Sequence, residues 1–310
     1  MARVSVIIPT YNPGEFFAAA LDSVVAQTFC DWELIVIDDG SRPEEWDAVR
    51  ESVERVRERA PHLAVELLRQ KNAGVSATRN RAVAMARGEW VAFLDNDDVW
   101  LPQKLEKQMA QLEAHPGVGL CHTGFDLIDG RDVRSPGYGR RVSFHEMLSG
   151  EFGVLLSSSV MSRAALIEVG LFDPFLPGAQ DLDVFFKIAH RHGLVYVDSV
   201  ETLYRLHGDN ASANYAMCYT EICHVLEKFR IWGEFKGDAA TAQAARKGLR
   251  KIRPTYSNQA FEAFRASLRA RNVSQMKNHA RRCFSISPPT ATRLFGGAVT
   301  GGLVKKVKRR

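Results

Sequence analysis

Short apolar runs alternate with longer amphipathic stretches through the first third of the chain. Four runs rich in Val, Ile and Leu have the length of buried strands: Val4–Ile8, Glu33–Ile37, Val65–Leu68 and Trp90–Leu94. The segments between them are long enough for helices: Glu15–Gln27, Glu44–Arg59 and Val75–Ala86. Strand followed by helix, repeated, predicts parallel strands with crossover helices. We therefore expect an α/β fold with a doubly wound, mostly parallel sheet.

The pattern is less regular after Trp100. It predicts helices at Pro102–Ala114, Arg163–Val169 and Gln180–His192, and a polar loop at Asp129–Tyr138. It predicts strands at Gly119–Phe125, Val154–Met161, Leu194–Val197 and Thr202–Arg205. From Tyr215 the pattern is helical, with breaks expected near Gly233, Pro254 and Pro288-Pro289. We therefore expect an α/β domain over residues 1–214 and a helical C-terminal region over 215–310.

Charge is divided between these two parts. Residues 215–310 hold 20 basic and 5 acidic residues, whereas residues 1–214 hold 21 basic and 31 acidic residues, although the net charge of the whole chain is only +5. Such a split predicts that the two parts face different partners. With 45% hydrophobic and 25% charged residues, the chain can bury a core, which argues against general disorder.

Cysteine usage and hydropathy indicate a compartment. The five cysteines are scattered and contain no C-x-x-C pair, which argues against a disulfide framework or a zinc knuckle and predicts a reduced, cytoplasmic protein. The apolar run after Arg3 is too short for a signal peptide. No apolar run approaches the roughly 20 residues that a membrane-spanning helix needs.

Polar residues follow each predicted strand of the first third. Thr10 and Tyr11 follow the first strand, Asp38 and Asp39 end the second, and Asp95-Asn96-Asp97-Asp98 follows the fourth. In doubly wound sheets, ligands bind beyond the carboxyl ends of the strands, so we expect these side chains to meet at one edge. Carboxylates gathered there would repel one another, and a bound cation would relieve the repulsion.

The sequence Asp95-Asn96-Asp97 is the strongest single motif. Two carboxylates on one loop are oxygen ligands of the kind that Mg²⁺ or Mn²⁺ prefers, and such ions keep positions open for phosphate oxygens. The same residues are also good turn formers, so a capping turn without metal is the alternative.

Several motifs together resemble family 2 glycosyltransferases, the inverting enzymes with the A-type nucleotide-diphospho-sugar-binding fold. The resemblance covers about residues 3–212. It rests on six segments in the family's order: Val4–Asn12, Ile37–Ser41, Asn72–Asp98, Val169–Asp173, Gln180–Asp183 and Tyr204–His207.

The resemblance implies a binding site for a UDP-sugar and for Mn²⁺ or Mg²⁺. It places nine residues around the nucleotide: Pro9, Thr10, Tyr11, Asp38, Asp39, Gly74, Arg79, Asp95 and Asn96. It places three residues at the metal: Asp95, Asp97 and His207. Taken singly, Tyr11 could instead pack on the first helix and Arg79 could form a surface ion pair.

The resemblance also implies a catalytic base. Inversion needs a group that takes the proton from the acceptor hydroxyl, and Asp181 matches the family's catalytic Asp. Asp183 lies about 200° further round the helix, so both cannot face one substrate. Gln180 stands where the family usually has Glu, and an amide cannot accept that proton. The alternative for Asp181 is a carboxylate stabilised by the helix dipole. Arg205 and Ser212 are placed near phosphate by the same resemblance.

The expected activity is transfer of a hexosyl or N-acetylhexosaminyl group from a UDP-sugar to a hydroxyl of a glycan or lipid-linked acceptor, in cell-surface polysaccharide synthesis. The alternative is a catalytically weak nucleotide-sugar-binding protein. The basic end, Gly302–Arg310, predicts peripheral attachment to the anionic inner face of the plasma membrane, with a frayed tail as the alternative. No segment resembles a nucleic-acid-binding motif, so nucleic acid is not an expected partner.

Overall fold

The computed structural model describes residues 2–207 and 214–300. These residues form two compact units. The first is built from residues 2–147 and 152–207, and the second from residues 148–151 and 214–300. The predicted C-terminal basic tail, Ser212 and Asn210 lie outside the described residues.

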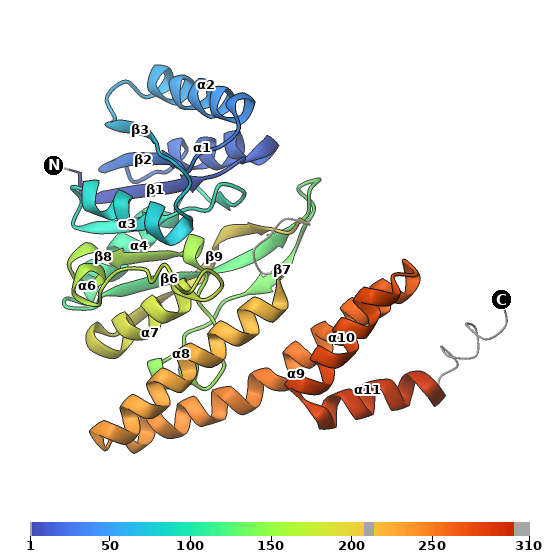
Figure 1. Ribbon diagram of the computed structural model, residues 1–310. Helices are drawn as coiled ribbons and strands as arrows, with labels where there is room; N and C mark the ends of the chain where they lie inside the picture. The colour runs from blue at the N-terminus through green and yellow to red at the C-terminus, as the bar shows by residue number, and fades with distance from the viewer. Residues whose placement is uncertain (1, 208–213, 301–310) are drawn as a thin grey trace. The chain divides into compact units, whose positions relative to one another are not determined.

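The first unit is organised around a nine-stranded sheet (Figure 1). Its strands are β1 (Val4–Thr10), β2 (Trp32–Asp38), β3 (Val65–Arg69), β4 (Trp90–Phe93), β5 (Val99–Trp100), β6 (Leu120–Ile128), β7 (Arg134–Tyr138), β8 (Ser159–Ser162) and β9 (Leu194–Arg205). The order is β3-β2-β1-β4-β8-β6-β9-β5, with β7 paired to β6. Strands β1, β2, β3, β4, β6 and β9 run in one direction, and β5, β7 and β8 in the other. The predicted mostly parallel sheet is confirmed.

Helices cover both faces of this sheet. They are η1 (Gly14–Phe16), α1 (Phe17–Val25), α2 (Pro43–Arg59), α3 (Val75–Met85), α4 (Lys104–Ala114), α5 (Phe144–Leu148), η2 (Leu156–Ser158), α6 (Arg163–Glu168) and α7 (Gln180–His192). Alternate residues of β1 point to opposite faces. Val6 and Ile8 join a core formed with α1, α2 and α4, whereas Ile7 joins a core formed with α3, α6 and α7. The fold is therefore doubly wound.

Four strands differ from the sequence prediction, and one of them, β5 (Val99–Trp100), was not predicted at all. Residues 134–138 form the exposed strand β7 where a polar loop was expected, because this strand pairs only with β6 and buries no side chain. The two short strands expected at 194–205 are one strand, β9, whose register against β6 shifts around Gly124. The strand expected from Val154 begins only at Ser159, after the short helix η2.

The second unit is helical, as predicted. It contains α8 (Tyr215–Lys236), α9 (Ala239–Arg269), α10 (Val273–Ile286) and α11 (Pro288–Thr300). The break expected at Pro288 is present. The break expected at Gly233 is not, because Gly233 lies inside α8 where a Cβ would come within 2.8 Å of the backbone of Ala242. Pro254 also lies within a helix, α9.

The five cysteines are all free thiols. Over the described residues, no helix has both the length and the apolar character that crossing a bilayer requires.

His122, in the middle of β6, gives a test of the fold. Its side chain is fully buried beside the Tyr196 ring, and neither ring nitrogen has a hydrogen-bond partner. Burial lowers the pKa of His122 from 6.5 to about 4. The unfolded chain therefore binds a proton that the folded chain does not, and stability is lost as the pH falls from about 6.5 to about 4.

For His122→Leu we expect this loss to disappear. The wild-type free energy of unfolding should fall relative to that of the variant by about 3 kcal/mol between pH 7 and pH 4. Urea unfolding of both proteins at the two pH values measures this difference. A parallel decline in both proteins would contradict the burial of an unpaired, neutral imidazole.

Candidate functional site

The carboxyl ends of β1, β2 and β4 form the edge at which the predicted site residues meet. Thr10, the last residue of β1, pairs in register with Asp38 of β2, and its carbonyl accepts the N–H of Asp39 at 2.8 Å. The loop after β4 joins them, because Asn96 Nδ2 donates to Thr10 Oγ1 at 3.1 Å. Three strand ends distant in the sequence are thus tied into one surface, as the parallel pattern predicted.

The Asp39 carboxylate fixes the loop that follows β3. Its Oδ1 accepts the N–H of Ala73 at 2.8 Å and the side-chain amide of Gln70 at 2.7 Å, and its Oδ2 accepts the N–H of Gly74 at 2.8 Å. Gly74 has φ +86°, which lets the chain turn directly into α3. One acceptor position on Oδ2 remains for a ligand.

Two neighbours of Asp39 differ in exposure. Asp38 is fully buried, with Oδ2 accepting the N–H of Ser41 at 3.2 Å and lying 3.3 Å from Arg69 Nε. Tyr11 is 54% exposed, so about half of its surface is open for stacking. Pro9, within β1, is buried and pairs in register with Ile37.

Arg79 is buried and forms an ion pair with Asp95, which is partly exposed. Arg79 Nη2 lies 2.6 Å from Asp95 Oδ1, and the Arg79 side chain is only 5% exposed. Its guanidinium lies over the ring of Phe172, and its Nε and Nη1 have no hydrogen-bond partner. The surface i,i+4 ion pair considered for Arg79 is therefore absent. Two buried donors remain for an oxygen of a ligand.

Asp181 stands at the beginning of α7, close to this ion pair. Burial raises the pKa of Asp181; the positive charge of Arg79 acts against that rise and the negative charge of Asp95 adds to it. A carboxylate with a raised pKa is a better proton acceptor than an ordinary one at neutral pH. Two nearby residues of α7 are less suited to accept the proton. Asp183 is fully buried and pairs with Lys187 at 2.6 Å, and Gln180 is a buried amide.

Asp97 and His207 are in direct contact. His207 Nε2 lies 2.8 Å from Asp97 Oδ2, and the Phe16 ring lies beside the imidazole. Burial and the charge of Asp95 raise the pKa of Asp97, whereas the His207 contact lowers it. The neighbouring carboxyl of Asp98 is fully buried, and burial raises its pKa well above the usual range.

The donors present fit a divalent cation. Asp97 and His207 bring together a carboxylate oxygen and an imidazole nitrogen, two kinds of donor that bind divalent ions such as Mn²⁺. Over residues 2–207 and 214–300, no three His, Cys, Asp or Glu side chains are grouped as a metal site, and Asp95 faces Arg79. Hard cations commonly take one or two protein ligands and complete their shell with water and phosphate oxygens.

Arg205 faces the protein interior. It is only 2% exposed, its Nε donates to the carbonyl of Asp97 at 2.9 Å, and its Nη1 donates to Asp132 at 2.6 Å. The guanidinium also stacks on the Phe16 ring, 4.3 Å from its centroid. Its geometry is that of a residue that holds the Asp97 loop from behind. The phosphate contact suggested by the resemblance finds no support in these contacts.

Phe16 and Phe172 pack against arginine side chains of the site, although no role was predicted for either residue from the sequence. The guanidinium of Arg79 packs on the Phe172 ring, and the guanidinium of Arg205 packs on the Phe16 ring. Phe172 lies within the segment Val169–Asp173 that carried the resemblance, so that motif was a usable signal. Phe16 had no such signal.

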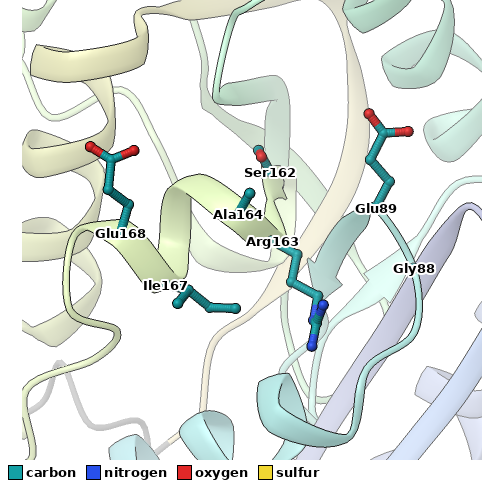
Figure 2. Close-up of a pocket in the computed structure, with 7 residues that line it drawn as sticks. All are labelled: Gly88, Glu89, Ser162, Arg163, Ala164, Ile167 and Glu168. Carbon is teal, nitrogen blue, oxygen red and sulfur yellow. The ribbon is translucent and has the colours of Figure 1, made fainter.

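A surface pocket of about 520 Å³ lies at the opposite end of β4. It is lined by Gly88, Glu89, Ser162, Arg163, Ala164, Ile167 and Glu168 (Figure 2). Figure 2 shows Glu89 and Glu168 on opposite sides of the view, with the Arg163 guanidinium pointing away from both. The charged groups of this pocket do not point toward one another, so the edge formed by the carboxyl ends of β1, β2 and β4 is the better candidate site.

Comparisons with known proteins show which sequences this chain resembles. The family described as Glycosyl transferase family 2 matches residues 5–166. A putative teichuronic acid biosynthesis glycosyltransferase, TuaG of Bacillus subtilis, is 35% identical over 125 residues, covering 40% of this chain and 47% of the relative. A putative colanic acid biosynthesis glycosyl transferase, WcaA of Escherichia coli, is 26% identical over 200 residues, covering 61% of this chain and 67% of the relative. The chain spans about two fifths of the length of several other curated relatives that it matches.

Solved structures share the fold. S. aureus TarS 1–349 in complex with UDP-GlcNAc has a TM-score of 0.60 at 18% identity, covering 90% of each chain. The mannosyltransferase PcManGT of Pyrobaculum calidifontis, in complex with GDP-Man and Mn²⁺, has a TM-score of 0.62 at 20% identity, covering 96% of this chain and 86% of that one. The A-type glycosyltransferase fold expected from the sequence is thereby confirmed.

Proposed function

This chain belongs to glycosyl transferase family 2, and from that premise we propose that it transfers a sugar from a UDP-sugar to a hydroxyl of a glycan or lipid-linked acceptor, with inversion. The observation that carries the proposal is the single strand-end edge that joins Thr10, Asp39, Asp95 and Asp97. Relatives named for teichuronic acid and colanic acid biosynthesis support a role in cell-surface polysaccharide synthesis.

The proposed nucleotide site uses the groups that the fold leaves available. The Tyr11 ring stacks on the base, and the remaining Oδ2 position of Asp39 accepts an imide N–H of uracil. The unpartnered donors of Arg79 bind an oxygen of the nucleotide. The remaining members of this site are Pro9, Thr10, Asp38, Gly74, Asp95 and Asn96.

Asp97 and His207, with Asp95, are the proposed holders of Mn²⁺ or Mg²⁺. Such an ion, when bound, offsets the charge of the departing diphosphate. A neighbour of the same fold that was solved with Mn²⁺ supports this assignment. The identity of the metal is part of the proposal.

Asp181 is the proposed catalytic base. Its carboxylate takes the proton from the acceptor hydroxyl as that oxygen attacks the anomeric carbon. Position at the beginning of α7, burial and the raised pKa support the choice of Asp181. Gln180 leaves no competing carboxylate at the preceding position.

We further propose that residues 1–214 form the catalytic domain and that the basic region 215–310 attaches the enzyme to an anionic membrane surface. Within its described part, residues 215–300, basic residues outnumber acidic ones by 15 to 5. Attraction to an anionic membrane surface contributes about 1 kcal/mol of binding free energy for each Lys or Arg near that surface.

Nucleotide selectivity tests the proposed donor. We expect the full chain with Mn²⁺ to bind UDP at least tenfold more tightly than GDP in a calorimetric titration. The single acceptor position left on Asp39 Oδ2 matches the one imide N–H of uracil, whereas guanine presents two N–H donor groups on the same edge. Equal affinity, or tighter binding of GDP, would contradict a UDP-sugar donor while leaving the family assignment intact.

A further inference from the structure

Three consecutive serines lie fully buried where η2 meets β8. They are Ser157, Ser158 and Ser159, and each has no exposed surface. Only the first reaches the candidate site. Ser157 Oγ accepts the backbone N–H of Asp95 at 3.1 Å, across 62 residues of sequence. This bond fixes the backbone just after β4 ends, where the acidic loop of residues 95–98 begins.

The main chain of Ser157 is itself held in place. Its carbonyl accepts the indole N–H of Trp100 at 2.6 Å and the hydroxyl of Thr202 at 3.4 Å. Trp100 lies in β5, directly after the acidic loop, and Thr202 lies opposite it in β9. The carbonyl of Ser157 is therefore bonded to β5, which follows the acidic loop, and to β9, which pairs with β5. Its hydroxyl is bonded to Asp95, at the beginning of that loop.

The acidic loop needs such an anchor. It carries three carboxylates within four residues, Asp95, Asp97 and Asp98, which repel one another. The turn is closed by one backbone bond of 3.1 Å, from the N–H of Asp98 to the carbonyl of Asp95. Contacts from Thr10 and Arg205 hold the later part of the loop, residues 96–98. The backbone N–H of Asp95, at the beginning of the loop, is held by Ser157.

We propose that Ser157 is a positioning residue for the acidic loop: its hydroxyl holds the Asp95 backbone so that Asp95 and Asp97 are arranged in advance for the cation and diphosphate of the donor. This inference rests on the proposed function. Ser157 acts through the acidic loop: its hydroxyl holds the Asp95 backbone and is also a hydrogen-bond partner of the Asp98 carboxyl. Arrangement in advance lowers the entropy that binding must otherwise overcome.

The neighbouring serine Ser159 supplies a matched control. It is equally buried, but its hydroxyl donates only to the local carbonyl of Leu156, at 2.8 Å. Ser159→Ala and Ser157→Ala remove the same atom from the same short segment. A merely structural role predicts that both variants lose similar stability and behave alike in every other respect.

Hydrogen exchange of the ligand-free full chain tests the anchor. In Ser157→Ala we expect the amide of Asp95 to exchange about tenfold faster than in wild type, because its acceptor is gone. In Ser159→Ala the exchange of this amide should equal that of wild type. Equal rates in the two variants would overturn the proposed anchor, whatever the nucleotide does.

Titration with UDP tests the purpose of the anchor. In the presence of Mn²⁺ we expect Ser157→Ala to bind UDP about tenfold more weakly than Ser159→Ala, and without metal we expect the two to bind UDP alike. Equal affinities with Mn²⁺ would overturn the positioning role while the proposed function stands. If wild type itself gains no UDP affinity from Mn²⁺, the metal site and the positioning role fail together.

Discussion

Asp181→Asn is expected to lower the rate of sugar transfer by about 10²- to 10⁴-fold, the range that removal of a general base produces. The amide keeps the shape of the side chain but cannot take the proton of the acceptor hydroxyl. UDP binding should be unchanged. The rate of UDP release from the donor with acceptor present, together with a UDP titration, separates the two effects.

Asp183→Asn is the control for this substitution. Asp183 lies on the same turn of α7, but it is fully buried and pairs with Lys187. We expect it to lower the unfolding temperature while the transfer rate stays within about threefold of wild type. If Asp183→Asn abolished transfer and Asp181→Asn did not, the assignment of the base would be wrong.

The same assignment predicts a pH dependence. Because burial raises the pKa of Asp181, its basic form is lost as the pH falls through a value above 3.8. The transfer rate in the wild type should therefore rise with pH, with a midpoint above that of an ordinary aspartate. Asp181→Asn should show a residual rate that lacks this rise.

Removal of the divalent cation should have an effect of similar size. If the ion supplies about 4 kcal/mol of charge stabilisation, EDTA should slow transfer about 10³-fold, and Asp97→Ala should do the same in the presence of Mn²⁺. Asp47→Ala removes a carboxylate from the exposed face of α2 and should leave the rate unchanged. Transfer by Asp97→Ala at the wild-type rate would contradict the metal assignment.

The sequence predicted β1, β2 and β4 well because these strands are buried on both faces. Such strands consist almost entirely of apolar residues, and β1, β2 and β4 lie within two residues of their expected bounds. Helix α7 matched at both ends, since Gly193 has a positive φ that ends a helix. Element order alone then predicted the doubly wound arrangement.

Elsewhere, tertiary packing overrode the local signals. Strand β7 is exposed along its length and contains Pro136 and Gly137, so its composition is that of a loop. Gly233 was expected to end a helix but is needed inside one, where two backbones approach closely. Neither the close approach nor the pairing of β7 with β6 leaves a mark in the local sequence.

The candidate site was predictable where its residues follow strands, and unpredictable where they support others. Thr10, Asp39 and Asp95 could be placed at one edge from the strand order alone. Ser157 could not, because a buried serine in an apolar segment has no distinctive spacing. The inward contacts of Arg205 were hidden for a similar reason: a sequence names the charge but not the direction of the side chain.

The most direct test of the proposed sugar transfer is nucleotide release from a panel of UDP-, GDP- and dTDP-sugars by the full chain with Mn²⁺. We expect UDP to be released from at least one UDP-sugar, and EDTA or Asp181→Asn to suppress the release. Tight binding of UDP without release from any donor, acceptor present or absent, would contradict transfer and favour the alternative of a catalytically weak nucleotide-sugar-binding protein.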